Sequence, residues 1–204
     1  MIGIVDYGMG NLLSVYNALE MVGADVQLCP EPKQLQTVER IVLPGVGAFR
    51  DCMVNLKKKG FVEALEDAVL GKSKPILGIC LGMQAMARRS FEGGEYQGLG
   101  WIDADVVRLQ PNDSLRVPQI GWNDIIYQLD SPLFSSLPPA PDFYFVHSYY
   151  MKCHNEINVD ATCDYGGLVT VAIRKGNIFA TQFHPEKSQE YGLKILENFL
   201  QWNP

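Results

Sequence analysis

Cys80 stands between two glycines in the stretch Gly-Ile-Cys-Leu-Gly at residues 78–82. The apolar run at residues 76–79 predicts a buried strand, and residues 83–87 are compatible with a helix. Glycines on both sides of a nucleophile allow a sharp turn from strand to helix, which lifts the side chain out of the sheet. The thiol would then lie at a helix N-terminus, where the helix dipole favours the thiolate. The alternative interpretation is a small cysteine buried in a core strand.

A histidine and a carboxylate lie close together near the end of the chain, in the stretch Phe-His-Pro-Glu at residues 183–186. Residues i and i+2 of an extended chain share a face, so Glu186 could orient His184 as a general base. His-Pro-Glu is also common on protein surfaces, so the tripeptide alone decides nothing. Together with Cys80, the pair supplies a nucleophile, a base and an orienting acid for acyl transfer.

Acyl transfer also needs hydrogen-bond donors for the oxyanion that forms on the substrate. The backbone amide of Leu81, directly after the nucleophile, is one candidate. The amide of Val46 is the other, because Gly45 and Gly47 on either side allow that peptide to turn inward. Residues 44–47 are equally compatible with a plain tight turn.

The motifs at residues 78–84 and 183–186 resemble those of the class I (triad) glutamine amidotransferases. Further stretches narrow the resemblance to the glutaminase subunits of imidazole glycerol phosphate synthase, and it spans essentially the whole chain. These stretches are residues 6–11, 44–47, 121–123, 145–149 and 164–167. The resemblance implies a flavodoxin-like amidotransferase fold and a glutaminase activity.

The resemblance also implies roles for individual residues. Cys80 would attack the side-chain amide of glutamine while His184, oriented by Glu186, moves the proton. A γ-glutamyl thioester would form, ammonia would leave, and water would release glutamate. The loop at residues 45–47 would carry an oxyanion donor, and four residues would help to hold glutamine. These four are Gln84, His147, Ser148 and Tyr149. No metal or cofactor is expected.

A partner is implied as well. Ammonia would pass to a separate (β/α)8-barrel synthase subunit of the HisF type, in a heterodimer that makes imidazole glycerol phosphate and an aminoimidazole carboxamide ribotide for histidine biosynthesis. Met9, Asn11 and Lys187 match positions that face this barrel. Gln119 departs from the pattern, because the family usually has histidine there. The departure leaves open a paralogue that supplies ammonia to another acceptor, such as a sugar amidated in surface-polysaccharide synthesis.

Two further interpretations remain open. The same fold could form a non-catalytic module that binds and regulates a partner, or a cysteine hydrolase that acts on a different substrate. The presence of Cys80, His184 and Glu186 argues against the non-catalytic module. Glutamate release from glutamine in the presence of the partner would separate that module from the amidotransferase.

The elements that must position these residues alternate in the first half of the chain. Apolar runs predict strands at residues 2–5, 25–28, 40–43 and 76–79. Helical spacing predicts helices at residues 12–22, with Asn11 as N-cap, and at 49–56 and 61–70. This order indicates a mostly parallel α/β sheet flanked by helices, whose sites lie at the carboxyl ends of the strands. Cys80 and residues 44–47 both follow such ends.

The second half of the chain shows a different sequence pattern. Short strand-like runs separated by turn signals lie at residues 105–107, 125–127, 143–146, 168–173 and 177–183. They predict additional antiparallel or mixed strands. A final helix should begin after Ser188 as its cap, and the proline-rich residues 131–141 read as a surface loop. We expect one domain over residues 1–204.

Composition restricts the class of protein. The 204 residues are 47% hydrophobic with a net charge of −6, which indicates a globular chain and argues against binding to a nucleic-acid backbone. The segment after the first predicted strand does not match the dinucleotide-binding pattern Gly-x-Gly-x-x-Gly, because Leu13 occupies the position of the third glycine. The five cysteines include no Cys-x-x-Cys pair, and no signal peptide or membrane-length apolar run is present. We therefore expect a cytoplasmic protein without disulfides.

Overall fold

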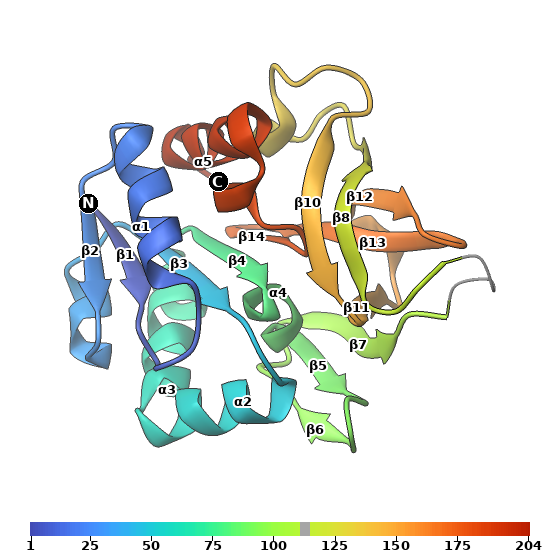
Figure 1. Cartoon of the computed structure of the whole chain (residues 1–204). Coiled ribbons are helices and arrows are strands. Elements are labelled where there is room, and N and C mark those ends of the chain that lie inside the picture. The colour runs from blue at the N-terminus through green and yellow to red at the C-terminus, as the bar shows by residue number, and fades with distance from the viewer. Residues whose placement is uncertain (111–114) are drawn as a thin grey trace.

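The structure is a computed structural model that describes residues 1–110 and 115–204. Within these residues the strands form three sheets (Figure 1). The largest has the order β2-β1-β3-β4-β14-β13-β12-β9, a second has the order β11-β7-β5-β6, and β10 pairs with β8. The expected α/β class with a parallel core and antiparallel additions is confirmed. None of the helices in the described part of the chain is long and apolar enough to cross a membrane.

Five neighbouring strands of the largest sheet run parallel. They are β1 Ile2–Val5, β2 Val26–Cys29, β3 Arg40–Gly45, β4 Ile76–Cys80 and β14 Ile178–Thr181. Strands β1, β4 and β14 are buried along their whole length, as expected for apolar strands covered on both faces. The carboxyl ends of β3, β4 and β14 meet at one edge, which brings together the three segments that the sequence singled out.

Helices cover both faces of the parallel strands (Figure 1). The α1 helix and the C-terminal α5 helix lie over one face, and α2 and α3 lie over the other. Their bounds are Leu12–Met21 for α1, Gln189–Gln201 for α5, Phe49–Lys58 for α2 and Phe61–Glu66 for α3. Each pair packs buried apolar side chains against the sheet, so the strand that carries Cys80 is held between two apolar layers.

A close approach of two backbones fixes the turn after β4. The α4 helix, Leu81–Ala85, begins directly after Cys80 and lies against the end of β3. A β-carbon placed on Gly82 would lie 1.8 Å from the carbonyl oxygen of Leu43. A β-carbon on Gly78 would lie 2.8 Å from the side chain of Met86. The two glycines around the nucleophile are therefore required by packing as well as by the turn.

The helix after Cys80 is shorter than expected. Residues 83–87 were compatible with a helix, but α4 ends at Ala85 and β5, Ala87–Ser90, follows. This expectation was wrong at Ala87 because residues of β5 find strand partners in β7, Ile102–Arg108, and β6, Tyr96–Gln97. Pairing with strands distant in the sequence overrides a local helical preference.

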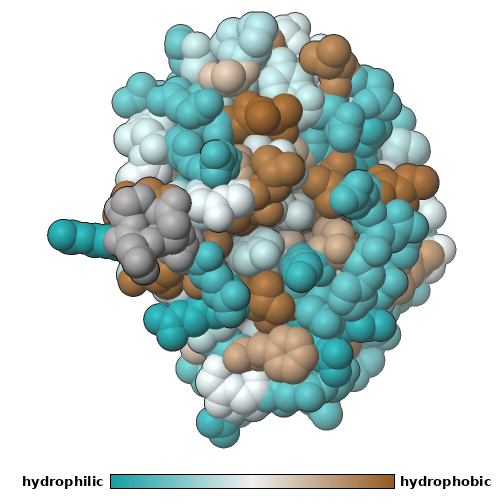
Figure 2. Space-filling model, turned by 90° about the vertical axis from the view of Figure 1, so that its right-hand side faces the viewer, coloured by the Kyte–Doolittle hydropathy of each residue, from teal (hydrophilic) through white to brown (hydrophobic). Residues whose placement is uncertain are grey.

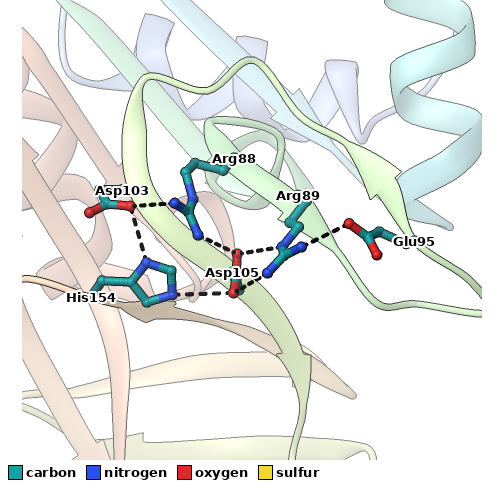
Figure 3. Close-up of polar contacts among 6 residues, drawn as sticks. All are labelled: Arg88, Arg89, Glu95, Asp103, Asp105 and His154. Carbon is teal, nitrogen blue, oxygen red and sulfur yellow. Dashed lines mark hydrogen bonds and ion pairs between the residues drawn. The ribbon is translucent and has the colours of Figure 1, made fainter.

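A charged network crosses the four-stranded sheet (Figure 3). The Asp105 carboxylate of β7 accepts hydrogen bonds from Arg89 of β5, at 3.1 Å to Nε, and lies 3.2 Å from Nε2 of His154. His154 follows β11, Tyr149–Cys153, and also contacts Asp103 at 3.0 Å. The network joins β5, β7 and the end of β11, and β11 in turn supplies Tyr149 to the site described below.

The antiparallel additions extend the largest sheet to one edge. These strands are β13 Leu168–Lys175, β12 Val159–Asp164 and β9 Ile126–Tyr127, while β8 Gln119–Asp124 and β10 Asp142–His147 form a separate ribbon. The predicted strands of this half are confirmed, but β5, β6, β8, β11 and β12 were not predicted. Figure 2 shows the side of the molecule at the right of Figure 1, where hydrophobic side chains form separate groups among hydrophilic ones.

Three local expectations need correction. Residues 131–141 are not a plain surface loop, because a short helical turn at Pro132–Phe134 buries Leu133 and Phe134 in the core. Asn11 occupies the N-cap position of α1, but its side chain makes no capping hydrogen bond. Ser188 precedes α5 without capping it. Its hydroxyl instead donates to the carbonyl of His184 at 2.7 Å and accepts from the amide of Tyr144 at 3.0 Å.

Substitution of Gly82 by alanine should strongly destabilise the chain. The new methyl group would overlap the Leu43 carbonyl, so either the elbow or β3 must move, at a cost of about 3 kcal/mol in unfolding free energy. Gly71→Ala is the matched control, since its β-carbon would meet nothing closer than 3.6 Å. Urea denaturation of both variants tests this, and equal midpoints for the two would contradict the assigned packing role.

Candidate active site

Cys80 lies at a strained turn between β4 and α4. Its backbone has φ 54° and ψ −108°, a conformation that L-residues rarely adopt. The residue is 8% exposed and borders an open cavity of about 470 Å³. Strain of this kind persists only where the surroundings enforce it, as the Gly82 contact does here. The expected sharp turn from strand to helix at Cys80 is present in the structure.

His184 and Glu186 form a buried pair directly after β14. Nδ1 of His184 lies 2.8 Å from Oε1 of Glu186, and the two side chains are 2% and 1% exposed. The contact was expected, but its geometry differs from the extended chain that we assumed, because Pro185–Lys187 forms a helical turn. The His184 backbone amide donates to the carbonyl of Tyr144 at 3.0 Å. With the Ser188 hydroxyl, this bond anchors the turn to β10.

The charge state of His184 follows from its surroundings. Burial lowers the pKa of the imidazole, but the neighbouring Cys80 side chain and the carboxylate of Glu186 outweigh burial and raise the pKa to about 9. The ring nitrogen Nε2 is buried without a hydrogen-bond partner in the described part of the chain. At neutral pH the ring therefore carries a proton that it can give to a leaving group.

The cavity brings together most of the predicted site residues. Beside Cys80 and His184, it is lined by the predicted oxyanion and substrate residues Val46, Gly47, Leu81, Gln84, His147, Ser148 and Tyr149. Glu186 does not reach it. The residue instead borders a separate hollow between α1 and α5.

Gly45 has a packing role at the predicted oxyanion loop. It pairs in register with Cys80, and a β-carbon on it would lie 2.7 Å from the hydroxyl of Tyr7 and 2.9 Å from the amide of Gly82. Gly47 has φ +101°, a conformation that favours glycine, and a β-carbon there would lie 3.0 Å from the Met9 side chain. The loop is therefore packed tightly at Gly45 and bordered by Met9 at Gly47.

Two of the predicted substrate residues are held by hydrogen bonds within the protein. Nε2 of Gln84 donates to the carbonyl of Tyr149 at 2.9 Å and to Oε1 of Gln182 at 2.8 Å. Nδ1 of His147 contacts the same Tyr149 carbonyl at 2.9 Å, and Nε2 lies 2.9 Å from the side-chain oxygen Oε1 of Gln119. Burial lowers the pKa of His147 to about 4, so this ring is neutral where His184 is charged.

Sequence reasoning missed two residues near the thiol. Glu92 lines the cavity and is its one carboxylate among the described residues; Oε2 accepts from the amide of Phe49 at 2.7 Å. Nothing in its local sequence indicated a site. Gln182 lies beside Cys80 and directly precedes the stretch at residues 183–186. Its place two residues before a candidate base was a usable signal.

Two of the three predicted partner-facing residues, Met9 and Lys187, lie at this cavity. Met9 contacts the loop at Gly47, and Lys187 lines the cavity with its ammonium 5.8 Å from the centre of the Tyr144 ring. Asn11 precedes α1. The β8–β10 ribbon adds exposed apolar side chains, with Ile120, Trp122 and Val146 on its outer face.

Substitution of Glu186 by glutamine should change how stability depends on pH. In the folded chain the pKa of His184 is about 9, above its ordinary value of 6.5. The protonated ring contributes stability that is complete below about pH 6.5 and is lost as the pH rises through about 9. Glutamine removes the contribution of the carboxylate to this pKa. The melting temperature of the variant should therefore fall less steeply over that interval than the parent's.

Glu190→Gln is the matched control, because it removes the same charge from an exposed position in the first turn of α5. Its melting curve should keep the parent's slope with pH. Equal slopes in Glu186→Gln and the parent would contradict the assigned coupling of the pair.

Comparison with known proteins agrees with this geometry. Residues 3–202 match the model of the family "Glutamine amidotransferase class-I". The chain is 48% identical over 200 residues to imidazole glycerol phosphate synthase subunit HisH 1 of Campylobacter jejuni (strain RM1221), covering 98% of this chain and 99% of that protein. It is 43% identical over 201 residues to subunit HisH 2 of Pseudomonas aeruginosa, covering 98% and 99%. With the HisH subunit of Brucella abortus (strain 2308) it shares 46% over 214 residues, covering 100% and 99%.

Solved structures show the same fold at lower identity. The chain superposes on PurLQS from Thermotoga maritima with a TM-score of 0.78 at 20% identity, covering 98% of this chain and 97% of that chain. A structure described as glutamine amidotransferase gives a TM-score of 0.77 at the same identity and coverage. The chain belongs to the class-I glutamine amidotransferase family and, within it, to the HisH subunits of imidazole glycerol phosphate synthase.

Proposed function

We propose that this chain, as a single domain over residues 1–204, is the glutaminase subunit of an imidazole glycerol phosphate synthase. The observation that carries the proposal is the strained Cys80 at the edge of a cavity that also receives His184, whose partner is the buried Glu186. A nucleophile, a proton carrier and an orienting carboxylate in this arrangement suit the hydrolysis of a carboxamide.

In the proposed reaction the sulfur of Cys80 attacks the side-chain carbonyl of glutamine. His184 gives its proton to the amide nitrogen, which leaves as ammonia while a γ-glutamyl thioester remains on the sulfur. Water then attacks the thioester, which releases glutamate and restores the free thiol. Glu186 holds the ring orientation and stabilises the imidazolium throughout. This chain supplies the hydrolase step, and the lyase step belongs to the synthase partner.

Substrate contacts follow from the cavity lining. The amides of Leu81 and Val46 are the proposed oxyanion donors, and Gly47 gives the loop the freedom to place the second one. The carboxylate of Glu92 suits the α-ammonium group of glutamine. Ser148 and Tyr149 also line the cavity and are the proposed source of further polar contacts.

Substitution of Cys80 by alanine should abolish glutamine hydrolysis. Without a sulfur no thioester forms, so partner-stimulated glutamate release should fall by at least about 10⁴-fold. Cys153→Ala is the control, because Cys153 is the most accessible of the other four cysteines. The barrel subunit bound to Cys80→Ala should still turn over when free ammonia is supplied. Substantial glutaminase activity in Cys80→Ala would refute the assigned nucleophile.

The proposed partner is a (β/α)8-barrel subunit of the HisF type. The names of the relatives describe subunits of a synthase, and the exposed apolar residues Ile120 and Trp122 lie on a ribbon whose inner residue His147 borders the cavity. A partner seated on this ribbon, with Met9, Asn11 and Lys187 at its margin, would cover the cavity mouth. Ammonia would then leave Cys80 toward the partner instead of water.

Trp122→Ala should weaken this heterodimer. Trp122 is 45% exposed and packs edge-on against Tyr144 at 6.0 Å, so it offers a large preformed apolar contact. Truncation of such a residue costs about 2 kcal/mol, which is about a 30-fold increase in Kd by calorimetry. Leu129→Ala is the control, since Leu129 is 93% exposed but lies off the ribbon. Equal affinities for Trp122→Ala and the parent would place the partner elsewhere.

A second acceptor is the alternative that one residue favours. Gln119 replaces the histidine expected in this family, and its amide contacts His147 on the inner side of the proposed docking ribbon. Mixing this chain with barrel subunits of both kinds and measuring glutamate release would identify the acceptor. We place the chain in the cytoplasm, in keeping with its five free cysteines.

A further inference from the structure

Gln182 contacts the sulfur of Cys80 from inside the protein. It follows β14, is fully buried, and places Nε2 3.6 Å from Sγ. This distance is within hydrogen-bond range for sulfur, whose radius exceeds that of oxygen. Gln182 is not among the residues that line the cavity, so its amide reaches the thiol from within the protein.

The orientation of the Gln182 amide is fixed by a second glutamine. Nε2 of Gln84 contacts two oxygen atoms, the Tyr149 carbonyl at 2.9 Å and Oε1 of Gln182 at 2.8 Å. Both are acceptors, so Gln84 must present its NH₂ group to them. Oε1 of Gln182 is thereby occupied, and its own NH₂ group is left to face the sulfur.

The chain of contacts continues beyond Tyr149. The carbonyl that accepts from Gln84 is also 2.9 Å from Nδ1 of His147, which in turn contacts Gln119. All four side chains in this row, those of Gln182, Gln84, His147 and Gln119, are at most 6% exposed. Within this row the Gln84 amide is held by two acceptors, so its orientation is fixed from both sides.

We infer that Gln182 is a positioning residue for the thiol of Cys80. Its N–H stabilises the thiolate and keeps Sγ at the mouth of the cavity, and Gln84 holds that N–H in place. The inference rests on the proposed role of Cys80 as nucleophile. In this inference Gln84 holds the Gln182 amide in place, in addition to any contact that it makes with glutamine.

The test is the pH dependence of alkylation of Cys80 by iodoacetamide in the full chain, followed by mass spectrometry of its peptide. No glutamine or partner is needed. The other four thiols stay protonated in the useful range, because burial raises the pKa of Cys29 and Cys153 to about 11 and that of Cys52 and Cys163 to about 12. Mass spectrometry reads alkylation of the Cys80 peptide separately from that of these four thiols.

Three variants separate positioning from packing. Gln182→Met removes the donor at similar volume, and the midpoint of the alkylation profile should move up by about one pH unit, which is about tenfold slower reaction at a fixed lower pH. Gln84→Met leaves Gln182 in place but frees its amide, and should shift the midpoint in the same direction by less. Thr181→Val removes a buried hydrogen bond to the Phe183 carbonyl at the same strand end and should leave the profile unchanged.

A folded Gln182→Met variant with the parent's profile would overturn the inference. If that variant does not fold, Gln84→Met decides alone, and an unchanged profile there overturns it equally. A shift of the same size in Thr181→Val would reduce Gln182 to a packing role. None of these outcomes depends on glutaminase activity. An unchanged alkylation profile would overturn only the role of Gln182, whereas glutamine hydrolysis by Cys80→Ala would refute the proposed function.

Discussion

A thiolate and an imidazolium can both remain inside a protein only as a compensated pair. His184 is almost fully buried, yet Cys80 and Glu186 raise its pKa to about 9 against the opposing effect of burial. Removal of either partner would leave the charge of the other poorly compensated in a low dielectric. The rest of the structure has to deliver these three side chains to one point and hold them there.

The parallel sheet meets this requirement because the carboxyl ends of its strands lie side by side. Strands β3, β4 and β14 are neighbours, and their carboxyl ends place the Gly45 loop, Cys80 and His184 side by side. Contacts made by backbone groups then fix the details. Gly82 allows α4 to touch the Leu43 carbonyl, and the amide of His184 binds the carbonyl of Tyr144. Both contacts limit motion where the proposed chemistry needs alignment.

The sequence allowed prediction of what depends on local pattern. Buried parallel strands appear as continuous apolar runs, and glycines beside Cys80 mark a turn whose geometry few residues tolerate. The strands that were missed, such as β8 and β11, are held by partners distant in the chain. The helix expected through Ala87 ends early for the same reason, because β5 pairs with β7. Ser188 shows the limit of capping rules, since its hydroxyl serves the turn of His184.

The residues that carry the proposed reaction could be predicted from the sequence. The residues that surround and support them were harder to predict. Cys80, His184 and Glu186 could be chosen because their residue types carry the chemistry. Glu92 could not, because an acid in a turn has many uses, and Gln182 was indicated only by its place two residues before His184. Only the folded chain shows their contacts. Glu92 lies 2.7 Å from the Phe49 amide, and Gln182 lies 3.6 Å from the thiol.

The central claim is that Cys80 forms a thioester with glutamine. The most direct measurement is mass spectrometry of the chain after rapid acid quench during turnover with glutamine and the barrel partner. We predict a mass increase of one glutamyl group on the peptide that contains Cys80, which disappears when the glutamine is exhausted. Absence of the adduct under conditions of active glutamate release, or its location on another residue, would contradict the account.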